Sequence, residues 1–394
     1  MMKLPTRFTS IGGQAVIEGV MMRSPHFVAV AVRKPNQRIT IKNFSYVGVA
    51  ARYPILKKPI LRGITTLVES MVQGIEALGF AAGVAAEEES AAKNPSTAKA
   101  ATGSASVLDP THASASAITI QKPSAAAKEE LSSWAIFTSI ATAFVLGMGL
   151  FVALPHLLTV LITSSPRVGL TAQSPIFHLI DGCLKMAILL SYVYLISLMK
   201  DIKRVFQYHG AEHKSIFTFE AGEALTVANA RKYPTLHPRC GTSFLLFLVL
   251  ISIAVFSIVF PLLGLTQLST HAWVNHAAMV GVKMVLMLPV AGLAYEVIKA
   301  CACRMENPLF KAIIWPGLVL QKLTTREPDD SQLEVALASL RQVLRMEKDT
   351  EESRAAAGVG RTLSTDGPEF GITEVADLEE IQWIAATVAE FPEI

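Results

Sequence analysis

The run TSFLLFLVLISIAVFSIVFPLL, residues 242–263, decides the fold, because it carries no charged side chain anywhere along its length. The hydrocarbon core of a bilayer is about 30 Å thick, and about 20 apolar residues in a helix are needed to cross it. No water can satisfy the backbone inside that core, so the segment must close its hydrogen bonds internally as a helix. The run is therefore predicted to be a transmembrane helix.

Three further segments have similar length and apolarity, namely residues 134–163, 176–199 and 277–300. The composition agrees, because 51% of residues are hydrophobic and 17% are charged, against about 25% charged in a typical soluble domain. The predicted fold class is mainly α: a polytopic α-helical membrane protein with about four transmembrane helices in a domain over residues 131–300. The lipid bilayer is its expected partner.

The distribution of Lys and Arg predicts the orientation. The segment 200–241 is rich in basic residues, whereas the short connections 164–175 and 264–276 hold Arg167 and no other Lys or Arg. Basic loops stay on the cytoplasmic side, so loop 200–241 and both termini are expected in the cytoplasm, with the protein in a bacterial inner membrane. The net charge of +3 gives binding to nucleic acid no electrostatic support.

Residues 1–85 are predicted to form a small cytoplasmic α+β N-terminal part. Partly alternating β-branched runs at 26–33 and 38–44, with Pro35-Asn36-Gln37 between them, are typical of a β-hairpin. From 60 to 80 the apolar period becomes helical. This amphipathic helix either packs on its own domain or lies on the membrane surface.

Two segments are assigned from composition. Residues 86–130, rich in Ala, Ser, Thr, Lys and Pro, are predicted to be a flexible linker, because they hold few large apolar side chains to bury. The acidic tail 349–394 is expected to be mostly solvated, with one acidic helix over 374–389.

Between the last span and the tail, residues 301–348 are predicted to be cytoplasmic. The stretch 308–320 is apolar but too short to span, and Pro316-Gly317 should break it, which indicates an interfacial or re-entrant segment. The capping box Ser331–Glu334 then begins a helix with leucines along one side.

The segment Tyr208-His209-Gly210-Ala211-Glu212-His213-Lys214 carries the strongest local pattern for chemistry. In a helix, His209 and His213 lie on one face, where two imidazoles can bind one divalent metal ion. Glu212 lies beside that face, and the order H-x-x-E-H matches the inverted zincin motif. Glu212 is therefore a candidate catalytic base. The alternative is a polar helix above the membrane whose histidines bond to neighbouring loops.

His237 and Cys240 end the same loop, and both residue types bind zinc well. The loop leaves and re-enters the membrane at neighbouring helices, so its two ends can converge. A straight helix, however, would carry His209 about 15 Å beyond the second span. The alternative is a turn fixed by proline, with Arg239 at the lipid headgroups and Cys240 inert.

Glu18 is bracketed by glycines in GGQAVIEGVMMR, residues 12–23. Glycine lets the backbone approach other groups closely, which makes Glu18 a candidate third ligand or catalytic base. The alternative is a turn followed by a buried strand, with Glu18 in an ion pair with Arg23 or Arg62.

Charged residues also occur inside the predicted spans. Asp181 and Lys283 fall at similar depths, so they are expected to pair, and Lys185 lies four residues after Asp181. Intramembrane charges suggest a functional role such as transport. We favour the alternative, a structural pair that locks two helices, because the spans lack the Gly/Pro breaks of a transporter's midplane site except at Pro289.

Several longer motifs resemble the YqhQ-like family, polytopic bacterial membrane proteins of unassigned function that are often labelled predicted metal-dependent enzymes. They are GGQAVIEGVMMR (12–23), LRG (61–63), FQYHGAEHK (206–214), HPRCGTSF (237–244), YE (295–296), PG (316–317) with Gln321, and TTREPDDSQLEVA (324–336). Carried over to this sequence, the resemblance points to Glu18, His209, Glu212, His213, His237, Arg239 and Cys240.

The leading hypothesis is a metal-dependent hydrolase with its site on the cytoplasmic face. A divalent ion, with zinc favoured, would be bound by His209 and His213 and by His237, Cys240 or Glu18, while Glu212 acts as the base. The sequence does not specify the substrate. One alternative is a non-enzymatic scaffold or assembly factor that binds a protein partner, and another is a transporter that uses Asp181, Lys185 and Lys283.

Overall fold

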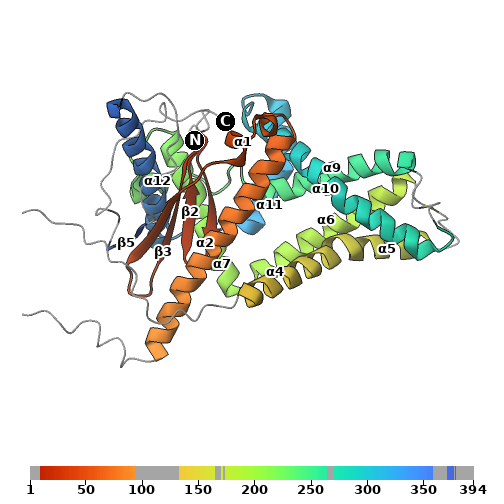
Figure 1. Ribbon diagram of the computed structural model, residues 1–394, viewed down its shortest axis with the longest axis horizontal. Helices are drawn as coiled ribbons and strands as arrows, with labels where there is room; N and C mark the ends of the chain where they lie inside the picture. The colour runs from red at the N-terminus through yellow and green to blue at the C-terminus, as the bar shows by residue number, and fades with distance from the viewer. Residues whose placement is uncertain are drawn as a thin grey trace, which may run out of the picture.

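The computed structural model describes residues 9–93, 133–164, 170–171, 174–263, 269–357, 371–376 and 378. An antiparallel sheet with helices on both faces forms one part, and a group of long apolar helices extends from it to one side (Figure 1). The candidate site lies where these two parts meet.

The sheet has the order β1-β2-β3-β4-β5, and each neighbouring pair is antiparallel. Its strands are β1 (Gly12–Val16), β2 (Gly19–Arg23), β3 (Phe27–Arg33), β4 (Ile39–Ser45) and β5 (Gly371–Val375). The predicted hairpin is confirmed as β3 and β4, with Val30 opposite Lys42. Because both faces of the sheet are covered, Val28 to Val32 are buried without interruption.

The fifth strand corrects the interpretation of the acidic tail. Gly371–Val375 pairs along β4 from Asn43 to Ile39, and Lys34 forms an ion pair with Glu374. The predicted acidic helix over 374–389 is thus wrong at its start, because β-branched residues there complete the sheet edge. Residue 377 and residues 379–394 lie outside the described part of the chain.

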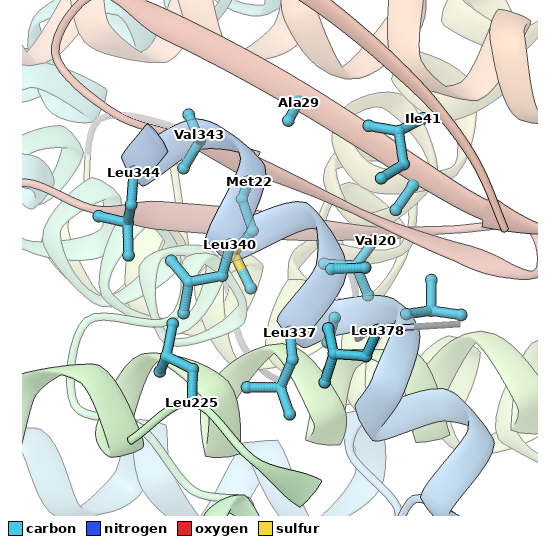
Figure 2. Packing of buried hydrophobic residues seen from close by; sticks show 14 of the residues in the cluster. Val20, Met22, Ala29, Ile41, Leu225, Leu337, Leu340, Val343, Leu344 and Leu378 are labelled. Carbon is cyan, nitrogen blue, oxygen red and sulfur yellow. The ribbon is translucent and has the colours of Figure 1, made fainter. Parts of the chain in front are cut away.

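Helices α7 (Lys200–Glu220) and α12 (Asp330–Ala357) cover one face of the sheet. Figure 2 shows Leu337 and Leu340 of α12 beside Val20 and Met22 of β2. The predicted apolar side of α12 is confirmed as buried, but the capping box begins two residues earlier than expected. Asp329 Oδ1 accepts from the backbone N–H of Gln332, whose side chain accepts in turn from the N–H of Asp329.

Helix α2 (Leu61–Lys93) covers the other face through Ala77, Ala81 and Val84. The helix is as predicted up to residue 80, but it continues to Lys93, into the segment predicted as a linker. Residues 94–132 are outside the described part. The sheet packs against the side of α2 that carries Gln73, so the large apolar side chains on the opposite side remain exposed.

The long helices occupy the four predicted spans within a few residues. They are α4 (Ser133–Met148), a π-helical turn (Gly149–Ala153), α5 (Leu154–Thr163), α6 (Pro175–Ser197), α9 (Gly241–Leu263) and α10 (Ala272–Ala302). Among the described residues, however, five helices are long and apolar enough to cross a membrane. The additional one is Leu61–Ala86 of α2, which the sequence predicts as an amphipathic helix because Glu69, Gln73 and Glu76 lie opposite its apolar face.

Helix α11 (Pro308–Thr324) corrects the predicted break at Pro316-Gly317, because the helix runs through both residues. Gly317 lies against Ser243 near the start of α9, where a side chain on Gly317 would clash. The remaining short elements are α1 (Val49–Arg52), a 3-10 turn (Pro54–Lys57) and α8 (Val227–Ala230).

Candidate metal centre

A break in the backbone between α6 and α7 positions the candidate metal ligands. Helix α6 ends at Ser197, and Met199 has an extended backbone with φ −72° and ψ 136°, so α7 starts in a new direction at Lys200. Because of this break, His209 does not lie as far from the end of α6 as it would in a straight helix. Because α9 begins at Gly241, directly after Cys240, the two ends of the connection return to one place.

His209, His213 and Cys240 form the centre. Each offers one ligand atom, and these three atoms lie within 4.8 Å of one another. His209 Nε2 is 3.0 Å from Cys240 Sγ. Zinc binds nitrogen at about 2.0–2.1 Å and sulfur at about 2.3 Å in a tetrahedron, so donor atoms this close fit a single ion.

Backbone carbonyls orient both imidazoles toward the centre. His209 Nδ1 is 2.9 Å from the carbonyl oxygen of Thr324, and His213 Nδ1 bonds to the carbonyl of Thr235. A carbonyl oxygen only accepts, so each Nδ1 donates its N–H and each Nε2 is left for the centre. Metal-binding histidines are commonly held in this way.

The electrostatics of the three residues also favour a cation. Burial raises the pKa of the Cys240 thiol, but the charges of His209 and His213 outweigh it and hold that pKa well below its ordinary value. Burial likewise lowers the pKa of His209, but Cys240 beside it raises the pKa to about 9. Near pH 7 the His209 ring therefore carries a proton beside the Cys240 sulfur, and a bound metal ion would replace that proton.

Glu212 lies next to the centre. Its side chain is buried, Oε2 is 3.5 Å from His213 Nε2, and burial raises the pKa of its carboxyl group. Gly13 of β1 makes room for it, because a Cβ atom at that position would lie 2.7 Å from Glu212 Cγ. The glycine-rich motif therefore admits Glu212 beside the candidate ligands.

His237, predicted as a ligand, is outside this group. Its Nε2 is 3.6 Å from Glu220 Oε2, and Gln321 holds its backbone through two hydrogen bonds of 2.8 Å. Burial lowers the pKa of His237 to about 4, so the ring is neutral near pH 7. His237 helps to shape the loop that carries Cys240.

Arg239 pairs with Glu220 and donates to the backbone carbonyl of Thr9. Arg239 therefore ties the N-terminal segment to α7. Glu220 is not among the site residues that the sequence motifs predict. A signal was available, because Glu220 lies seven residues after His213 and therefore near the same helical face.

Glu18, predicted as a catalytic residue or ligand, also lies outside the group. It occupies the β1–β2 turn with φ 50°, pairs with Arg204 and accepts a hydrogen bond of 3.3 Å from the hydroxyl of Tyr208. The alternative ion pair is thus present with a different partner. Arg23 contacts Tyr46, and Arg62 pairs with Glu296.

A second polar cluster lies among the long apolar helices, away from the centre. Asp181 Oδ2 accepts hydrogen bonds from Lys185 at 2.6 Å and from Lys283 at 2.7 Å, as the sequence predicts. His156 is 3.2 Å from Lys283 Nζ. The rings of Phe177, Phe256 and Phe260 surround Lys283. This enclosed pairing joins α6 to α10.

These features define a helical protein with helices of membrane-spanning length, a covered antiparallel sheet, and a group of two histidines and one cysteine where the two parts join. The family described as "Protein of unknown function (DUF1385)" matches residues 58–346. A protein of Bacillus subtilis (strain 168), "Uncharacterized protein YqhQ", is 30% identical over 349 residues, which cover 87% of this chain and 95% of that protein. The chain belongs to this YqhQ-like family. No solved structure matches it.

The Arg239–Glu220 pair allows a test of its structural role. Arg239→Met would leave the Glu220 carboxylate buried without its cation, so we expect the free energy of unfolding to fall by about 3–5 kcal/mol. Combining it with Glu220→Gln should recover most of that loss. The control, Arg231→Met, removes an exposed pair with Asp330 and should have little effect. Denaturant unfolding measures all three; equal losses at Arg239 and Arg231 would contradict the assignment.

The cluster around Asp181 predicts that substituting the shared carboxylate costs more stability than substituting one of its lysines. Asp181→Asn leaves two buried lysines without their shared carboxylate, so it should cost about 3–5 kcal/mol of unfolding free energy. Lys283→Met leaves Asp181 paired with Lys185 and should cost less. Unfolding of both variants in one detergent gives the comparison, and the reverse order would show that the pairing does not dominate the stability of this region.

Proposed function

We propose that the chain is a multi-pass membrane protein of the bacterial inner membrane with a metal-dependent hydrolytic site on its cytoplasmic face. The observation that carries the proposal is the convergence of the ligand atoms of His209, His213 and Cys240 within 4.8 Å. The supporting observation is that backbone carbonyls orient both imidazoles toward the same point.

The donor set favours zinc among divalent ions. Two imidazoles and one thiolate suit zinc, and three protein ligands leave a fourth position open, as in catalytic and not structural zinc sites. When bound, zinc would act as a Lewis acid that polarises a substrate oxygen and makes a water molecule more acidic.

Glu212 supplies the acid–base chemistry in this proposal. Its carboxylate lies beside His213 and away from bulk solvent, where it would take a proton from the attacking water and return it to the leaving group. The water oxygen forms the new bond to the substrate, and the bond to the leaving group breaks. His237 and Arg239 act indirectly, because they hold the loop that carries Cys240.

The cytoplasmic location rests on charge. The centre is built from the ends of the segment 200–241, which contains Lys200, Lys203, Arg204, Lys214, Arg231, Lys232 and Arg239. Basic segments next to apolar helices remain on the cytoplasmic side. Cys240 immediately precedes α9, so the centre would lie at the inner edge of the bilayer.

Metal content tests the proposal directly. Purified protein should contain about one zinc ion per chain by elemental analysis, because three converging donors bind one tetrahedral ion. His209→Ala, His213→Ala and Cys240→Ser should each lose most of that metal. The control His271→Ala alters an exposed histidine at the start of α10 and should keep it. A folded wild-type protein without metal, copurifying with a stable protein partner, would favour the scaffold function instead.

The Glu212→Gln variant tests whether Glu212 acts as a base or as a metal ligand. The variant should retain the metal, because the three ligands are intact. Any hydrolysis of activated esters or phosphoesters by the wild-type protein should fall by about 100-fold or more, as expected for loss of a general base. Loss of metal in this variant would instead make Glu212 a ligand.

A further inference from the structure

Helix α2 carries a continuous apolar stripe that the described part of the chain leaves uncovered. Its members are 40% to 61% exposed and recur at helical spacing: Val68, Met71, Val72, Ile75 and Leu78. The polar side chains flanking the stripe are tied to the sheet region, since Glu69 binds the backbone N–H of Val49 and Glu76 pairs with Lys42. The stripe is therefore held facing away from the sheet.

The sheet prevents α2 from crossing a bilayer, although its length and apolarity would allow it. Ala77, Ala81 and Val84 pack on the strands along the middle and end of the helix, and Gly74 lies against the side-chain amide of Gln14. A membrane-spanning α2 would carry strands and their ion pairs into the hydrocarbon core, where exposed sheet edges and unsatisfied polar groups are not tolerated.

The start of α2 lies at a definite level along α10. Gly63 packs against Gly292, with the Gly292 carbonyl oxygen 2.9 Å from the position of an added Cβ. Gly292 is 19 residues beyond Trp273, where the apolar part of α10 begins, a rise of about 29 Å. That rise equals the thickness of the hydrocarbon core, about 30 Å. The candidate span of α10 continues to Ala302, so helix α2 starts beside the inner part of that span.

Helix α11 lies beside the start of α9. Its inner face packs on α9 through Gly317 and Ser243, and Ser243 is the third residue of α9. Its outer face exposes Leu309 and Trp315, at 63% and 62%. Tryptophan is enriched where bilayer and water meet. Helix α11 thus presents its apolar face where α9 would leave the membrane, and α2 begins beside the inner part of α10.

Basic side chains accompany both apolar faces. Exposed basic residues precede α2 at Arg52, Lys57 and Lys58, precede α11 at Arg304, and lie on α11 itself at Lys311 and Lys322. Anionic headgroups attract such residues with about 1 kcal/mol each near the surface. Apolar stripes with neighbouring basic residues are typical of helices that lie in the interface.

We propose that α2 and α11 lie in the membrane interface, with their apolar faces in the acyl boundary of a bilayer that contains anionic lipid. In this arrangement α4 with α5, α6, α9 and α10 cross the membrane, and α2 does not. The interfacial helices then hold the sheet, and with it the candidate metal centre, against the bilayer surface. The inference rests on the membrane location proposed above but not on the hydrolytic activity.

Site-directed spin labelling of the full chain in nanodiscs with anionic lipid tests the proposal. Single cysteines replace Val68, Met71, Val72, Ile75 and Glu76 in turn, on a background where the exposed Cys183 and Cys303 are serine. Labels on the stripe should be relaxed more by oxygen, which partitions into lipid, than by a water-soluble nickel chelate. The label at position 76, on the same helix beside Lys42, should show the opposite preference.

Each contrary outcome has a distinct meaning. Accessibility to the nickel chelate along the whole stripe would show that the stripe faces water and would overturn the inference. Protection of the stripe from both reagents would indicate that a protein partner covers it. Oxygen preference at position 76 as well, with depth changing steadily along α2, would indicate a membrane-spanning helix. A label at Ile258→Cys in α9, 65% exposed, is the reference: if it too lacks oxygen preference, the membrane location itself fails.

Discussion

The 3.0 Å contact between His209 Nε2 and Cys240 Sγ depends on two features of the chain. Cys240 is fixed by the start of α9, whose apolar residues determine where the helix must begin. His209 is fixed by α7, which can approach only because the helix breaks at Met199. Once these two ends meet, His213 follows one turn later on the same face, and the carbonyls of Thr235 and Thr324 set the ring orientations.

Helix α7 connects the sheet to the long helices. Twelve of its residues are buried, because it packs against β1 and α12 on one side and bears the centre on another. Glu212 occupies the space left by Gly13, and Glu220 receives Arg239 from the cysteine loop. A shift of α7 relative to β1 would therefore disturb the candidate base, the ligands and the buried ion pair together.

Much of this arrangement is encoded in local patterns of the sequence. Uncharged runs predict the long helices, a four-residue spacing places His209 beside His213, and equal depth predicts the contact of Asp181 with Lys283. The features that sequence reasoning missed depend on distant contacts. Pairing with β4 makes Gly371–Val375 a strand, and packing on Ser243 supports a continuous α11. Glu18 forms its ion pair with Arg204, which is distant in the sequence. His237 was expected among the ligands, but Glu220, which no motif had indicated, lies beside it.

The central claim is that His209, His213 and Cys240 bind one metal ion directly. X-ray absorption at the zinc edge of the purified protein tests it most directly. The account predicts two nitrogen ligands at about 2.0–2.1 Å and one sulfur ligand at about 2.3 Å, with the sulfur contribution absent in Cys240→Ser. A spectrum of oxygen and nitrogen ligands alone in the wild-type protein would contradict it.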